Sequence, residues 1–134
     1  MLLKGDTSVL PICIKDTEKY GRGIYATRDI KTGELIEVSP VLISCKDEWK
    51  YLKKTALFDY CFTWGENYEQ TAVALGYGSL FNHSYTPNTT FINNIPNLSI
   101  DFYAINDIKD GEEITINYNE NPDDKSPLWF DVIE

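Results

Sequence analysis

The sequence predicts a mostly β protein. At 134 residues the chain can build one compact domain with its own core, and its hydrophobic content of 43% argues against disorder. Short apolar or alternating runs are separated by turn residues every eight to twelve residues, counted roughly, and one or two short helices are expected among them. We therefore expect several small sheets and a single domain over residues 1–134.

The N-terminal third predicts three strands and a glycine turn. Residues 9–14 read as an edge strand because the proline within them cannot donate a backbone hydrogen bond. Gly21-Arg22-Gly23 predicts a turn whose backbone can approach a ligand closely. It lacks the third glycine of a dinucleotide-binding fingerprint, which excludes that class of protein. Residues 34–38 alternate as a strand should, and residues 41–44 are expected to form a separate strand after Pro40.

The middle of the chain predicts a short helix and two strands. Residues 47–54 are the best helix candidate because apolar residues lie among charges there. Residues 57–64 are rich in aromatic residues and end at Gly65, which favours a strand. Residues 71–75 are apolar enough for a buried strand.

The last third predicts three more strands and a polar tail. Residues 89–92 and 98–105 look like strands joined by a turn-rich connection. A strand over residues 112–118 is expected after a turn at Lys109-Asp110-Gly111. The tail is polar until Trp129-Phe130, an aromatic pair that needs a surface to pack against.

One polar stretch, residues 78–88, holds the chain's only histidine, His83, between Asn82 and Asn88. It follows the apolar run at residues 71–75, so its donors and acceptors must be satisfied if it is buried. Asn, Ser and Pro are also the residues of an ordinary tight turn. From this stretch alone, a turn and a functional site both remain open.

The charge is strongly asymmetric. The net charge is −9, and from Asp101 onward ten Asp and Glu stand against two Lys. Such an end disfavours direct binding to nucleic acid and favours a basic, lysine-containing protein or peptide as partner. The competing interpretation is that acidity serves solubility.

The cysteines predict a reducing compartment. Cys13, Cys45 and Cys61 are widely spaced and form no CxxC pair, so we expect reduced thiols and no metal site. The first six residues become polar too quickly for a signal peptide, and no apolar run reaches the length of a membrane span. We expect an intracellular protein, cytoplasmic or nuclear, without membrane partners.

Three motifs together resemble a known family. They are Gly21-Arg22-Gly23-Ile24-Tyr25-Ala26, then Leu80-Phe81-Asn82-His83-Ser84 with Pro87-Asn88, then Gly111-Glu112-Glu113-Ile114-Thr115-Ile116-Asn117-Tyr118. In this order and spacing they resemble the motifs of SET-domain protein lysine methyltransferases. The resemblance implies a SET-domain fold of the β-clip type, with a core at about residues 12–118, a closing segment at 119–134 and a C-terminal pseudoknot where the second and third motifs cross.

The resemblance also implies a function and a cofactor. It predicts a protein lysine N-methyltransferase that uses S-adenosylmethionine and acts on a basic segment, with histone tails as one possibility. Tyr118 matches the active-site tyrosine of the family. The backbone at Tyr20-Gly21-Arg22-Gly23 would hold the methionine end of the cofactor, and Asn82 its amino or carboxylate end. His83 would offer its backbone to the adenine and its ring to the pseudoknot.

Other roles carry an alternative. Arg22 is either a cofactor contact or a turn residue, and Tyr25 either contacts the cofactor or packs. Trp129 and Phe130 either cap the cofactor and complete the channel or pack on the surface. We expect four further residues to line the substrate channel, although strand aromatics are more often core: Tyr60, Phe91, Tyr103 and Ile116.

The chain departs from the family pattern at the closing module. Many members carry a cysteine after Asn-His-Ser and a zinc module downstream, whereas Tyr85 stands here and the tail has no cysteine. No zinc is expected, and Trp129-Phe130 would have to close the site. The alternative function is a catalytically weak or inactive SET-fold module that binds cofactor or a basic peptide.

Overall fold

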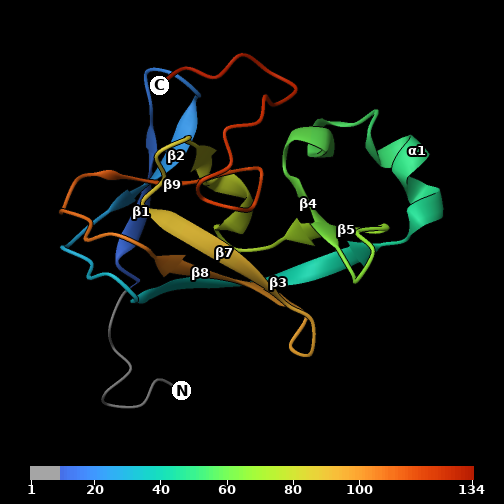
Figure 1. Cartoon of the computed structure of the whole chain (residues 1–134), viewed down its shortest axis with the longest axis horizontal. Coiled ribbons are helices and arrows are strands. Elements are labelled where there is room, and N and C mark those ends of the chain that lie inside the picture. Colours follow the sequence, from blue (N-terminus) through green and yellow to red (C-terminus); the bar gives the residue numbers. More distant parts are fainter. Residues whose placement is uncertain (1–9) are drawn as a thin grey trace.

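The computed structural model describes residues 10–134, so Val9 and the residues considered for a signal peptide lie outside it. Two curled sheets carry the fold, in the strand orders β1-β2-β9-β6 and β4-β5-β3-β8-β7 (Figure 1). This mostly β architecture confirms the predicted fold class. The strands are β1 (Ile12–Asp16), β2 (Arg22–Ala26), β3 (Leu35–Ser44), β4 (Cys61–Trp64), β5 (Gln70–Ala74), β6 (Asn82–His83), β7 (Thr89–Asn94), β8 (Ser99–Ala104) and β9 (Glu113–Ile116).

The smaller sheet joins segments that are far apart in the sequence. Strand β2 pairs antiparallel with β1 and with β9. Strand β6 pairs parallel with β9, so that Asn82 lies opposite Thr115 and His83 opposite Ile116. The two motifs that the resemblance expects to meet therefore lie side by side.

The larger sheet contains one strand where the sequence predicts two. Strand β3 runs unbroken through Pro40, so the predicted break there is wrong. The Pro40 carbonyl accepts a hydrogen bond from the Leu75 amide (2.8 Å), just beyond the end of β5 at Ala74. The nitrogen and carbonyl of one strand residue point toward the same neighbour. The Pro40 nitrogen, which carries no proton, therefore faces the end of β5, and the hydrogen-bonded pairing of β3 with β5 loses little.

Three helical segments lie in the insert between β3 and β4, namely η1 (Lys46–Glu48), the single-turn α1 (Trp49–Leu52) and η2 (Ala56–Asp59). A fourth, the 3₁₀ turn η3 (Gly78–Leu80), lies between β5 and β6. The helix predicted over residues 47–54 is confirmed, although it is shorter and begins as a 3₁₀ turn. The strand predicted over residues 57–64 is wrong in its first half, because the Thr55 hydroxyl accepts from the Leu57 amide (3.2 Å) and caps η2. No helix of the described residues is long and apolar enough to cross a membrane.

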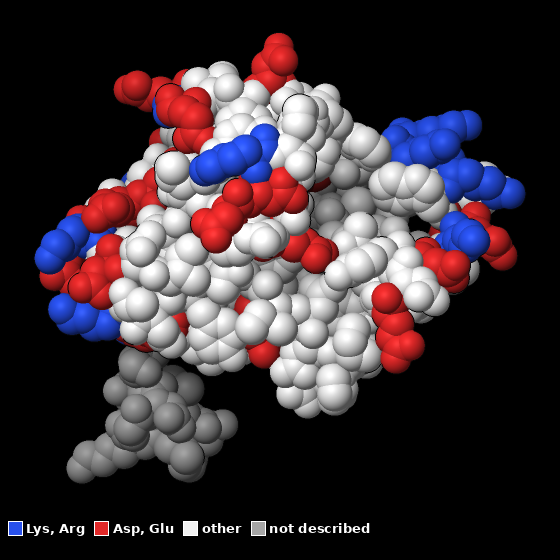
Figure 2. Space-filling model, viewed as in Figure 1, with Lys and Arg blue, Asp and Glu red and all other residues white. Residues whose placement is uncertain are grey.

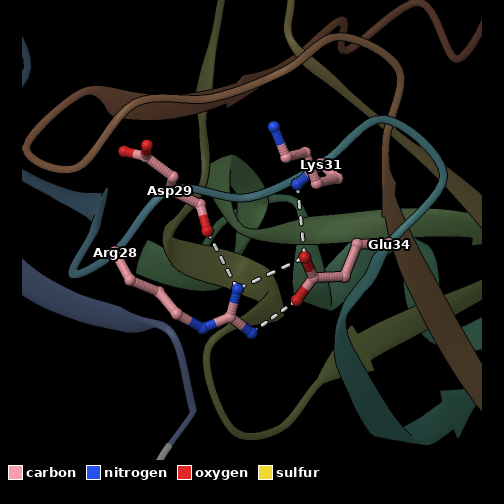
Figure 3. A network of polar contacts seen from close by, with 4 residues as sticks. All are labelled: Arg28, Asp29, Lys31 and Glu34. Atoms are coloured by element: carbon pink, nitrogen blue, oxygen red, sulfur yellow. Dashed lines mark hydrogen bonds and ion pairs between the residues drawn. The ribbon is translucent and has the colours of Figure 1, made fainter.

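A surface network closes the turn between β2 and β3 (Figure 3). Arg28 reaches across it, donating through Nη1 to the Asp29 carbonyl (2.9 Å) and through Nη2 to Glu34 Oε2 (2.5 Å). Glu34 Oε1 also accepts from the Lys31 amide (3.2 Å). The Arg28 guanidinium lowers the pKa of Glu34. The network sets how the chain enters β3 and lines none of the cavities described below.

The core lies under the junction of β6 and β9. Ile24, Ile114 and Ile116 are completely buried there. The Phe81 ring, just before β6, packs on Phe102 of the larger sheet with centroids 4.6 Å apart. Burial of apolar surface on both sheets thus sets where Asn82, His83 and the end of β9 lie.

Candidate active site

Tyr118 lies two residues beyond the end of β9, and the segment just before β6 holds its side chain. Its hydroxyl donates to the Phe81 carbonyl (2.7 Å). Burial raises the pKa of Tyr118 first of all, and negative charge on nearby groups such as Glu113 and Asp59 adds to the shift. The phenol is therefore neutral near pH 7, and its oxygen can accept a hydrogen bond while its proton is directed at a backbone carbonyl.

His83 supports Tyr118 through the backbone. Its Nδ1 accepts from the Tyr118 amide (3.0 Å), so the ring proton is on Nε2. Burial lowers the pKa of His83, which keeps the imidazole neutral and able to accept. Tyr85 and Tyr118 pack against the ring, with centroids at 4.5 and 5.3 Å. These contacts give His83 a positioning role.

One cavity of about 310 Å³ lies on one side of Tyr118. Five residues predicted to bind cofactor line much of it, and they come from three segments far apart in the sequence. Its volume is at the lower end of what cofactor-sized ligands need. The predicted residues that line it are Tyr20, Arg22, Asn82, Trp129 and Phe130.

A smaller cavity of about 150 Å³, called the narrow cavity below, also reaches Tyr118. Two residues predicted for the substrate channel, Tyr60 and Phe91, line it. Phe62 and Phe81 add aromatic walls. The two cavities share five lining residues, so they meet beside the Tyr118 side chain: Asp59, Tyr60, Ser79, Tyr118 and Trp129.

Asn82 is oriented by two acceptors. Its Nδ2 donates to the Arg22 carbonyl (3.1 Å) and to Glu113 Oε2 (2.8 Å). This leaves Oδ1, an acceptor, for another partner. The same contacts explain why residue 23 is a glycine. A Cβ there would lie 2.6 Å from Glu113 Oε2 and 2.7 Å from Asn82 Nδ2, which is too close. Gly21 adopts a φ of +74°, which non-glycine residues rarely do.

The C-terminal segment packs against the cavities. Trp129 stacks on Tyr118 (centroids 6.0 Å apart, rings at 14°) and donates through Nε1 to Asp59 Oδ1 (3.1 Å). The rings of Phe130 and Tyr20 pack edge to face with their centroids 6.1 Å apart. The Tyr20 hydroxyl donates to the Ile133 carbonyl (3.0 Å) and accepts from its amide (2.5 Å). Figure 1 shows this red segment returning over β9 and ending beside β2.

The structure puts other predicted residues outside both cavities. Tyr25 lies on β2 opposite Cys13 and Glu113, with Lys15 Nζ 5.5 Å from its ring. Tyr103 lies on β8 between Leu35 and Thr90. Gly21, Gly23 and His83 act on the site through the backbone or through neighbours, and Ile116 is a core residue.

The sequence reasoning missed four side chains near Tyr118. Asp59 was read as part of a strand, whereas the 3₁₀ turn η2 brings it to the junction of the cavities. Ser79 is another of the shared lining residues, and Glu120 lines the narrow cavity, with its carboxylate accepting from Thr63 (3.0 Å). The fourth is Glu113, whose carboxylate accepts from Asn82 (2.8 Å) and to which the sequence analysis assigned no role. A carboxylate inside an aromatic run was the one signal that could have drawn attention to Asp59.

A broad groove of about 730 Å³ opens between the insert and strands β4 and β5. Trp49, Phe58 and Phe62 give it an apolar floor, and Trp129 connects it to the narrow cavity. Lysines 46, 50 and 53 also line it. In Figure 2 one group of basic side chains lies over the α1 region at the right, with acidic side chains beside it, and both kinds also lie elsewhere on this face.

Comparisons with known proteins agree with this geometry. The model of the SET domain family matches residues 21–119. A Schizosaccharomyces pombe protein named histone-lysine N-methyltransferase, H3 lysine-37 specific, is 37% identical over 90% of this chain and 78% of its own length. A Plasmodium falciparum variant-silencing SET domain-containing protein is 33% identical over 81% of this chain, which spans 5% of that protein.

Solved structures show the same fold. The crystal structure of a Plasmodium falciparum protein, named as a candidate histone methyltransferase, superposes with a TM-score of 0.66 at 32% identity, covering 83% of this chain and 95% of the other. A chain of the Chaetomium thermophilum Polycomb Repressive Complex 2 bound to S-adenosylmethionine gives 0.69 at 25% identity, covering 85% of this chain and 16% of the other.

The chain therefore belongs to the SET-domain family. The enzyme class predicted from the sequence, a protein-lysine methyltransferase, is confirmed by the family match together with the S. pombe relative.

Proposed function

We propose that this chain transfers a methyl group from S-adenosylmethionine to the side-chain amine of a lysine in histone H3 or in another basic protein. The observation that carries the proposal is the meeting of two cavities beside Tyr118. One has the size and polar groups for a cofactor, and the other is narrow and aromatic enough for an unbranched side chain. In-line transfer requires donor and acceptor to approach one another from two such sides.

The residues of the larger cavity fit the cofactor. Asn82 Oδ1 would accept from its ammonium group, because the Asn82 nitrogen is already engaged. The absence of a side chain at Gly23 lets the Asn82 amide lie this close to the backbone of β2. Tyr20, Trp129 and Phe130 would pack on its flat ring system. When bound, S-adenosylmethionine supplies the sulfonium-activated methyl group.

The narrow cavity would prepare the lysine. An amine must be neutral to attack, and lysine is charged near pH 7. Aromatic walls at Tyr60, Phe62 and Phe91 lower the amine's pKa by desolvation, and a neighbouring cation lowers it further. The Tyr118 hydroxyl, fixed by its bond to the Phe81 carbonyl, would orient the amine lone pair. Water exclusion would be completed by Trp129.

The relative's name and the net charge of this chain support a histone or another basic protein as substrate. The S. pombe relative is named for lysine 37 of histone H3, which makes histone H3 the first substrate to test. The net charge of −9 would attract a basic tail. A histone substrate also agrees with the intracellular compartment predicted from the cysteines.

The test is methyl transfer from labelled S-adenosylmethionine to recombinant histones, with mass spectrometry of the product. We expect the wild type to label histone H3. Tyr118→Phe should lower the rate about 100-fold or more, as loss of one aligned polar group at a reacting centre does. Tyr103→Phe is the matched control, because it removes the same hydroxyl outside both cavities. A wild type that binds the cofactor and labels no basic protein would instead be a binding module.

A further inference from the structure

Asp59 lies beside Tyr118, but the methyl transfer proposed above assigns it no role. It ends η2 and is exposed at the junction of the two cavities. Of the five residues that line both cavities, Asp59 alone carries a charge. A lysine side chain that reaches Tyr118 at this junction would lie close to this carboxylate.

The Asp59 carboxylate is only partly engaged. Its Oδ1 accepts from Trp129 Nε1 (3.1 Å). Within residues 10–134, no Lys or Arg forms an ion pair with it, and Oδ2 has no hydrogen-bond partner. Its negative charge is among the causes that raise the pKa of Tyr118, which indicates that the field of Asp59 reaches the reacting centre.

We propose that Asp59 binds the ammonium group of the target lysine at the junction of the two cavities and so selects a cationic side chain over a neutral one of the same shape. The inference rests on the proposed function. In this arrangement Trp129 holds one carboxylate oxygen in place, and the free oxygen faces the entering amine. Charge-assisted hydrogen bonds are about twice as strong as neutral ones, which gives the selection its physical basis.

Binding of the lysine ammonium group by Asp59 would help capture of the substrate but would oppose the deprotonation that methyl transfer requires. A carboxylate favours the protonated form of a nearby amine, so it strengthens capture and delays deprotonation. The Asp59→Asn variant should therefore show a higher KM for the lysine peptide. The acidic limb of its pH–rate profile should move to lower pH. The other titratable or charged side chains facing this space are Tyr20, Arg22, Tyr60, Cys61, Tyr118 and Glu120.

The competing role for Asp59 is to position Trp129 alone. Two substitutions separate the roles. Asp59→Asn keeps an acceptor for Trp129 Nε1 and removes the charge, whereas Trp129→Phe removes the donor and keeps the charge. Asp123→Asn makes the same exchange at an exposed carboxylate that lines neither cavity.

The experiment measures binding of two histone H3 peptides in the presence of S-adenosylhomocysteine. One contains the lysine specified by the S. pombe relative's name, and the other has norleucine there, which has a similar shape without charge. We expect the wild type and Asp123→Asn to prefer the lysine peptide by about five- to tenfold near pH 7. Asp59→Asn should bind the two alike, and Trp129→Phe should retain the preference.

The outcomes separate this inference from the proposed function. Equal binding of both peptides by the wild type, or a preference that survives Asp59→Asn, overturns the role of Asp59. Loss of the preference in Trp129→Phe as well would reduce Asp59 to a holder of that ring. Methyl transfer is not needed for this comparison, so a wild type that selects lysine without labelling it would overturn the proposed function alone.

Discussion

The junction of β6 and β9 and the C-terminal segment, residues 119–134, both contribute walls to the cavities beside Tyr118 but are held in different ways. At the junction, backbone pairing lies over completely buried Ile114 and Ile116. The C-terminal segment has no strand or helix, and Trp129 at its contact with Tyr118 is 53% exposed. Hydrogen bonds such as that of Tyr20 with Ile133 tie it down at the surface.

The two regions therefore have different roles. The junction contributes to the stability of the fold, and the C-terminal segment closes the site. Burial of apolar surface at the junction contributes to the free energy of unfolding of the whole fold. The C-terminal contacts bury little and can open without unfolding the core, since local opening costs less where few apolar contacts are lost. We infer a site with one fixed wall and one wall that can open to admit a cofactor.

Substitution in the fixed wall should have the largest effect. Ile116→Ala should lower the free energy of unfolding by about 3 kcal/mol, because it removes three carbons from a fully buried side chain and leaves a cavity. Urea denaturation measures this. Ile92→Ala, on an exposed side chain of β7, is the control and should cost less than about 1 kcal/mol. Similar losses for both would mean that the junction is not a centre of stability.

Substitution in the C-terminal wall should change the stability little and the affinity for the cofactor more. Trp129→Ala should lower the free energy of unfolding by less than about 1 kcal/mol, since the side chain is half exposed. Affinity for S-adenosylmethionine, measured by calorimetry, should fall about tenfold because an aromatic wall of the larger cavity is lost. A variant that unfolds like Ile116→Ala but binds cofactor normally would reverse the assignment of the two walls.

The smallest effect concerns pH and also belongs to the fixed wall. Burial lowers the pKa of His83 below its ordinary value of 6.5, so the unfolded chain binds a proton more readily than the folded one. This part of the stability is present above pH 6.5 and is lost as the pH falls through the folded pKa. Between pH 7.5 and 5.5 the free energy of unfolding should fall by up to about 1 kcal/mol.

The His83→Gln variant is the control for this pH dependence. It cannot titrate, and His83 is the chain's only histidine, so the slope in this window should flatten. An unchanged slope in urea denaturation across the same pH range would show that other groups cause it.

Sequence patterns predicted most elements because strand periodicity and turn residues are local. They failed at Pro40 and at residues 57–64, where distant or neighbouring polar contacts decide. The pattern could not show that the Pro40 nitrogen, which has no proton to donate, faces the end of β5, where strand pairing loses little. Nor could it weigh the Thr55 cap against the β propensity of Leu57 and Phe58. That residues 1–134 form a single domain stays a prediction.

The sequence alone determined the family, the enzyme class and Tyr118 as the candidate reacting residue, because these depend on short motifs whose order can be read directly. The tertiary structure decided which aromatic residues meet. It brought Tyr60, Phe91 and Trp129 to Tyr118, and it put Tyr103 and Ile116 elsewhere. It also brought Asp59 to Trp129, across seventy residues of chain. Such contacts depend on how two curled sheets pack together, and no local pattern encodes that packing.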